Sequence, residues 1–83
     1  MVFPREVLNK LKWRPGMGLM RARIQYEHRG APDNARTISG EEIVDLGRSF
    51  FGTADSRIPY HRIRRIDLLD ENGEVVESWA FSP

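Results

Sequence analysis

Two short segments each place a histidine beside an arginine, and these residue types suit the binding of an anion. The segments are His28-Arg29-Gly30-Ala31 and Ile58-Pro59-Tyr60-His61-Arg62-Ile63. A guanidinium can donate two parallel hydrogen bonds to phosphate oxygens, and a histidine can add another donor. Gly30 would let the backbone turn sharply and approach a ligand closely. Taken alone, each segment is more typical of a strand end with solvated charges. Together they would form one anion pocket if the strands that carry them are neighbours.

Aromatic residues near basic ones are the next candidates. Tyr60 can stack on a nucleic-acid base or pack in the core. Trp13 stands in the basic segment Lys12-Trp13-Arg14, where an exposed indole can stack on a base. Tryptophan more often has a packing role, so Lys12 and Trp13 are secondary candidates.

Paired histidines can also act as general acid and base on a phosphodiester. Neither His28-Arg29-Gly30 nor His61-Arg62-Ile63 has the His-x-Thr/Ser pattern of two-histidine phosphoesterases. No cysteine is present and no third ligand stands at a telling spacing, so no metal site is predicted. Nucleotide-loop and hydrolase motifs are also missing, so no cofactor is expected. Binding is favoured over catalysis, and we assign no catalytic residue.

The charge of the chain is uneven. The 83 residues carry a net charge of +1, but residues 1–36 hold eight Lys/Arg against three Asp/Glu. Residues 1–36 therefore carry a net charge of +5, and residues 37–83 a net charge of −4. A basic half favours an RNA or an acidic protein partner. No apolar run resembles a signal peptide or a membrane span, so a cytoplasmic protein without membrane contact is expected.

Apolar spacing predicts the elements that must position these residues. Val7, Leu8 and Leu11 recur at helical spacing, which predicts a helix over about residues 4–12. Residues 19–28 alternate, with Met20, Ala22, Ile24 and Tyr26 on one face, as in a half-buried strand. The capping box at residues 39–42 predicts a second helix over about 40–48.

The last third of the chain predicts a hairpin. Ile63 and Ile66 are three residues apart within a strand over 58–69, which indicates a bulge near Arg64-Arg65. Asn72-Gly73 marks a tight turn, and residues 74–81 form the returning strand. The expected fold is α+β. It is a compact single domain over residues 1–83, with two helices packed on a small, mostly antiparallel sheet that ends in a β-hairpin.

Strand order decides whether the two His-Arg segments meet. If strand 19–28 lies beside strand 58–69 and antiparallel to it, the end of the first comes close to the start of the second. His28, Arg29, His61 and Arg62 would then surround one point. The sequence does not fix this pairing.

Four segments in order carry a family resemblance. They are Leu8-Asn9-Lys10-Leu11-Lys12-Trp13, His28-Arg29-Gly30-Ala31, Ile38-Ser39-Gly40-x-x-Ile43 and Ile58-Pro59-Tyr60-His61-Arg62-Ile63. Their order and spacing resemble the RNA cyclic group end recognition domain, a small and mostly archaeal family, over nearly the whole chain. The resemblance implies binding of RNA ends with a cyclic phosphate, in RNA processing or repair. By position it implies phosphate contacts at His28, Arg29, His61 and Arg62, and a support or stacking role for Tyr60.

The resulting hypothesis is an RNA-binding module for phosphorylated ends, with a single-stranded RNA 3′ end as partner and an RNA-processing enzyme as a further candidate partner. Its expected binding residues are Lys12, Trp13, His28, Arg29, Gly30, Tyr60, His61 and Arg62. Two alternatives stay open. One is a protein-interaction domain that docks its basic half and an edge strand on a partner. The other is a two-histidine phosphodiesterase.

Overall fold

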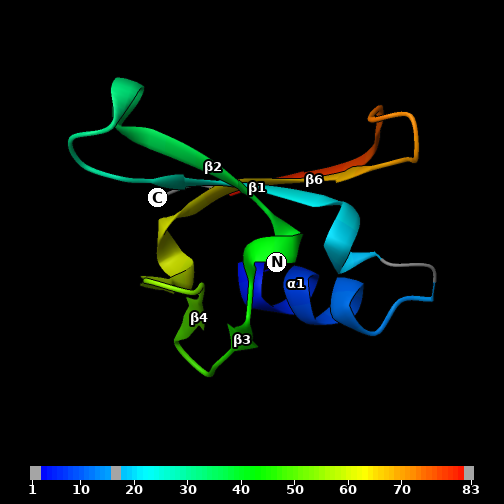
Figure 1. The fold of residues 1–83 in the computed structure, drawn as a ribbon, viewed down its shortest axis with the longest axis horizontal. Helices are drawn as coiled ribbons and strands as arrows, with labels where there is room; N and C mark the ends of the chain where they lie inside the picture. The colour runs from blue at the N-terminus through cyan, green and yellow to red at the C-terminus, as the bar shows by residue number, and fades with distance from the viewer. Residues whose placement is uncertain (1–2, 16–17, 82–83) are drawn as a thin grey trace.

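A four-stranded antiparallel sheet forms one layer of the computed structural model, which describes residues 3–15 and 18–81. Its strands, in spatial order, are β2 (Ala35–Ser39), β1 (Ala22–Glu27), β6 (Ile63–Leu69) and β7 (Val75–Ala80). The other layer contains helix α1 (Pro4–Lys12) and a small antiparallel sheet of β3 (Asp45–Leu46), β4 (Phe50–Gly52) and β5 (Arg57–Pro59). Figure 1 shows both elements on the same side of the larger sheet.

The core lies between these layers. Helix α1 begins at Pro4, whose fixed φ suits a first turn, and it buries Val7, Leu8 and Leu11 toward the sheet. The completely buried Phe51 of the small sheet lies between two tyrosines. Its ring centroid is 6.3 Å from that of Tyr26 and 5.8 Å from that of Tyr60. These aromatic contacts join the two sheets.

The prediction of two helices on one sheet is wrong. The helix over 4–12 is confirmed, but the described residues contain no other α-helix and hold two antiparallel sheets, so the fold is mostly β. The capping box at Ser39 exists, yet it caps only the 3₁₀ turn η3 (Gly40–Glu42). The backbone is already extended at Ile43. The segment contains three weak helix formers, Ile43, Val44 and Gly47. The packing of short strands therefore outweighs the local tendency to form a helix.

The first predicted strand is shorter than expected. Residues Leu19–Arg21 form the 3₁₀ turn η1, and the strand begins at Ala22. Ala22, Ile24 and Tyr26 are buried as the alternation predicts, whereas Met20 is exposed because it lies on the turn. Strand β2 was not predicted. Of its five residues only Ile38 is buried, so its sequence carries a weak apolar pattern.

The bulge and the hairpin are confirmed. Gln25 pairs with Arg65 and Tyr26 pairs with Ile63, so Arg64 is the extra residue in β6. This insertion allows Ile63 and Ile66, three residues apart, both to be buried. The hairpin turn between β6 and β7 is closed by Gly73, whose φ is +82°, and by the Asp70 carboxylate, which accepts from two backbone N–H groups.

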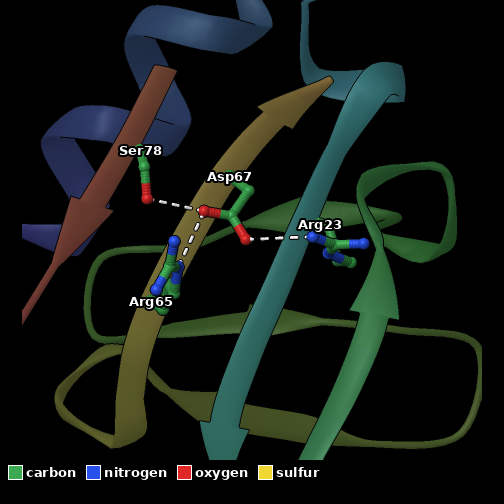
Figure 2. A network of polar contacts seen from close by, with 4 residues as sticks. All are labelled: Arg23, Arg65, Asp67 and Ser78. Atoms are coloured by element: carbon green, nitrogen blue, oxygen red, sulfur yellow. Dashed lines mark hydrogen bonds and ion pairs between the residues drawn. The ribbon is translucent and has the colours of Figure 1, made fainter. Parts of the chain in front are cut away.

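The face of the larger sheet that points away from α1 is open and polar, and it holds a buried carboxylate. Asp67 is only 5% exposed and accepts hydrogen bonds from Ser78 (2.6 Å), Arg65 (2.8 Å) and Arg23 (3.3 Å). Figure 2 shows these donors converging on it from β1, β6 and β7. Burial, the largest single influence, raises the pKa of Asp67. The three hydrogen bonds and the positive charge of Arg65 together lower the pKa by more than burial raises it, so it lies below its ordinary value of 3.8.

We expect Asp67→Asn to lower the free energy of unfolding by about 1–3 kcal/mol near neutral pH, because charge-assisted bonds in a buried site are lost. The folded-state pKa is below the unfolded value, so the carboxylate stabilises the fold above pH 3.8 and loses this contribution as pH falls through the folded pKa. Urea unfolding at several pH values between 7 and 2.5 measures this. The gap between the variant and the wild type should close at the acid end. A gap independent of pH would contradict the argument.

Candidate functional site

The pairing of β1 with β6 brings the two His-Arg segments together. Tyr26 lies opposite Ile63 in antiparallel register, so the chain leaves β1 where it enters β6. A hollow of about 530 Å³ at this point is lined by Glu27, His28, Arg29, His61 and Arg62. The prediction of one strand over 58–69 is wrong, because residues 57–59 form β5 of the small sheet, residues 60–62 form a 3₁₀ turn and only residues 63–69 form β6. The antiparallel pairing of β1 with β6 still groups both histidines and both arginines around one hollow, as predicted.

The turn after β1 holds the first pair. The backbone N–H of His28 donates to the carbonyl of Asn34 (2.9 Å), and the His28 carbonyl accepts from the N–H of Ala31 (3.2 Å). Gly30 has φ +91°, a left-handed value that glycine adopts without strain. The His28 ring and the buried Tyr26 ring form a T-shaped pair, with 6.2 Å between centroids. These contacts hold the turn that carries the exposed residues His28 and Arg29.

Tyr60 supports the second pair and is not available for stacking. It begins the 3₁₀ turn η4 (Tyr60–Arg62), is only 7% exposed and packs on Phe51. Its hydroxyl donates to the Gly47 carbonyl at 2.8 Å, and burial raises the pKa of that hydroxyl above 10.0. Of its two proposed roles, the structure is consistent with support. The anchored Tyr60 carries His61 and Arg62 outward.

Arg64 sets the charge of the hollow. Its guanidinium donates to the His61 carbonyl (3.0 Å) and forms an ion pair with Glu27. The one carboxylate that lines the hollow is thereby neutralised. Within residues 3–15 and 18–81, Arg29 and Arg62 form no ion pair and both are exposed. The hollow therefore presents two guanidinium groups that can each bind an external anion.

Lys12 and Trp13 do not join this site. Arg14, the next residue, forms an ion pair with Glu77, which lies opposite Leu68. Leu68 is five residues along β6 from Ile63, a distance of about 17 Å. Trp13 is 78% exposed, and the Lys12 ammonium lies 5.4 Å from its ring centroid. The prediction that they share a surface with the His-Arg pairs is not supported by this placement.

Two residues of the site were not in the predicted set, Glu27 and Arg64. The only signals for them were the outward phase of Glu27 next to His28 and the bulge at Arg64.

A second hollow adjoins the first around the turn after β1 and the edge strand β2. It shares His28 and Arg29 and adds Arg36 and Thr37 of β2.

Other functional features were also sought in the described part of the chain. No group of three or more His, Cys, Asp or Glu side chains there could hold a metal ion. None of the helices found there has the length and apolar character required to cross a membrane. The His-Arg hollow, which groups two histidines and two arginines, is the candidate functional site.

Comparison with known proteins identifies relatives of this chain. Residues 1–79 match the family model described as the MJ1316 RNA cyclic group end recognition domain. A UPF0248 protein of Thermococcus onnurineus is 40% identical over 72 residues, which span 87% of this chain and 79% of that protein. UPF0248 proteins of Methanococcus vannielii and Pyrococcus abyssi are 39% and 38% identical over 72 residues, again 87% of this chain and 85% and 83% of theirs. No solved structure matches the chain significantly.

Proposed function

The chain belongs to the family of the MJ1316 RNA cyclic group end recognition domain, and from this premise we propose that it is an RNA-binding module for phosphorylated ends. The bound group is the 2′,3′-cyclic phosphate of a single-stranded 3′ end, and the process served is RNA processing or repair. The observation that carries the proposal is the hollow itself. Arg29 and Arg62, both without an ion-pair partner among the described residues, face the same space from two different turns.

The mechanism is recognition by charge and shape. Arg29 and Arg62 donate charge-assisted hydrogen bonds to the phosphate oxygens, each worth about 1.5–3 kcal/mol. His28 and His61 add donors from the rim. A cyclic phosphate carries one negative charge in a rigid ring, whereas an open terminal phosphate carries close to two. The ion pair of Glu27 with Arg64 neutralises the carboxylate at the rim, so it does not repel the phosphate, and the rigid shape of the ring distinguishes the cyclic group from an open phosphate.

The test is a titration of three short RNAs that differ only at the 3′ end: a hydroxyl, a 3′-phosphate and a 2′,3′-cyclic phosphate. We expect the tightest binding for the cyclic phosphate, and intact RNA afterwards. Equal affinity for the three ends would overturn the proposal and leave a general charged surface. If the ring is opened during the titration, His28 and His61 act as an acid–base pair and the protein is a phosphodiesterase. Absence of RNA binding would favour the protein-interaction alternative.

A further inference from the structure

The open face of the larger sheet carries a chain of hollows that begins at the proposed end site. The hollow beside the end site shares His28 and Arg29 with it and reaches Thr37. A third hollow shares Thr37 and is lined by Arg23, Gln25, Arg65 and Asp67. A fourth shares Arg23 and Thr37 and extends to Met20. Because neighbouring hollows share lining residues, the four follow one another along β1 and β2, and the last lies at the strand ends beside Ala22 and Ile38; we call this series the track.

The register of the strands puts polar side chains over this track. Arg23, Gln25 and Glu27 alternate with the buried residues of β1, and their cross-strand partners are Ser39, Thr37 and Ala35 on β2. Gln25 and Thr37 are both exposed and lie directly opposite each other. On the other side of β1, Gln25 pairs with Arg65. This face is therefore uncovered and hydrophilic at its centre.

Two arginines give the track its charge. Arg23 and Arg65 each donate one hydrogen bond to Asp67, while about half of each side chain is exposed, 47% and 53%. A guanidinium has five N–H donors, so most of their donors still face solvent. Asp67 balances only one of the two positive charges. The carboxylate thus holds both guanidinium groups in place and leaves a net positive charge on the sheet.

The side chains that the register places on this face include no aromatic residue among those that the structure describes. At its centre lie Arg23, Gln25, Thr37, Arg65, Asp67 and Ser78, and at one end the apolar pair Leu69 and Val75. Single-stranded RNA is commonly read by stacking its bases on aromatic rings, and this face offers none. What it does offer is guanidinium, amide and hydroxyl groups, which bind phosphate and ribose.

We propose that this face is a second binding site, a track for the phosphodiester backbone of the nucleotides on the 5′ side of the bound RNA end. The inference rests on the proposed function, because the end site sets where the RNA begins. From His28, just after β1, to Arg23 within β1, the track spans five residues, about 17 Å, which accommodates a few nucleotides. Because the contacts are to backbone, the track binds them without base preference.

The experiment measures Kd for RNAs of one, two, three, four and six nucleotides, all ending in a 2′,3′-cyclic phosphate, at low and moderate salt. We expect the affinity to rise with length and then level off. The salt dependence should be steeper for the four-nucleotide RNA than for the mononucleotide, because more phosphates are contacted. Oligonucleotides of different sequence but equal length should bind alike.

Substitutions that change the charge at Gln25 test whether the length-dependent RNA affinity comes from the open sheet face. At low salt, Gln25→Glu should weaken binding of the four-nucleotide RNA about three- to fivefold, and Gln25→Lys should strengthen it by a similar factor. Neither should change the Kd of the mononucleotide. The matched controls are Ala54→Glu and Ala54→Lys. They make the same charge changes at an exposed residue of the turn between β4 and β5, in the other layer, and should have no effect.

The outcomes separate the two proposals. If the mononucleotide binds and added length gives no gain, the track is refuted and the end site stands. The track is also refuted if Gln25→Glu weakens the mononucleotide and the longer RNA equally. Length-dependent binding that responds to Gln25 but is indifferent to the 3′ end would keep the track and refute end recognition. If no RNA binds at all, both proposals fail.

Discussion

Replacing Arg29 and Arg62 together by alanine should abolish selective binding of a phosphorylated RNA end while the protein remains folded. Each guanidinium contributes a charge-assisted interaction of about 1.5–3 kcal/mol, so the double variant should bind at least a hundredfold more weakly. Both side chains are exposed and make no ion pair within the described residues, so their loss leaves the core intact. Titration with the cyclic-phosphate RNA measures the affinity, and thermal unfolding checks the fold.

The matched control is Lys10→Ala with Lys12→Ala, which also removes two positive charges from exposed positions. These lysines belong to α1, in the layer away from the open sheet face, so RNA affinity should change little. Equal loss in both double variants would mean that only net charge matters, and end recognition would then be rejected. Unfolding of the Arg29/Arg62 variant would instead assign those arginines a structural role.

Arg64→Ala tests a different contribution to RNA affinity from the double variant, because Arg64 acts on the hollow through His61 and Glu27. It holds the His61 carbonyl and neutralises Glu27, so its loss should leave a free carboxylate at the rim. A smaller decrease than in the double variant is expected, since both phosphate-binding guanidinium groups remain. Repeating the measurement with Glu27→Gln in the same background should restore part of the affinity. A lack of restoration would show that Arg64 matters for local packing alone.

The candidate site was largely predictable because its residues are chemically distinctive and lie at the ends of strands. The alternation in β1 and the interrupted phase in β6 locate those ends within a few residues. The antiparallel pairing of β1 with β6 was needed to join the two His-Arg segments, and this pairing depends on packing between segments about 40 residues apart. A single sequence carries no direct signal for that contact.

The position of three further residues depends on tertiary partners that their local sequence pattern does not reveal. Trp13 stands in a basic segment, yet the Arg14–Glu77 ion pair places that segment at the far end of β6. Tyr60 has the side chain for stacking, but its hydroxyl reaches the Gly47 carbonyl and its ring is buried. Arg64 and Arg65 are adjacent in sequence, and the bulge gives them different partners, Glu27 and Asp67.

Gly40, the first residue of the 3₁₀ turn that stands in place of the predicted second helix, makes a close contact between two backbones. Gly40 is buried, and a Cβ at this position would lie 1.8 Å from the carbonyl oxygen of Leu19 and 2.9 Å from its carbonyl carbon. Residues on η1 and η3 therefore meet with no space for a side chain. Because η1 leads into β1 and η3 follows β2, this contact fixes the approach of the two strands at the end remote from the His-Arg hollow.

Gly40→Ala should consequently be the most damaging single methyl addition that the structure identifies. The clash is with backbone atoms, so no side-chain rotation can relieve it, and we expect a loss of about 3 kcal/mol or more in the free energy of unfolding. In a domain of this size that corresponds to a decrease in Tm of about 15 °C. Urea and thermal unfolding measure both quantities, with Gly52→Ala as the control, because its added Cβ would meet no atom closer than 3.7 Å. If both variants are equally stable, the Gly40–Leu19 contact does not hold the two strands together. If only Gly40→Ala is destabilised, the Ser-Gly-Glu-Glu segment owes its glycine to this contact and not to a helix.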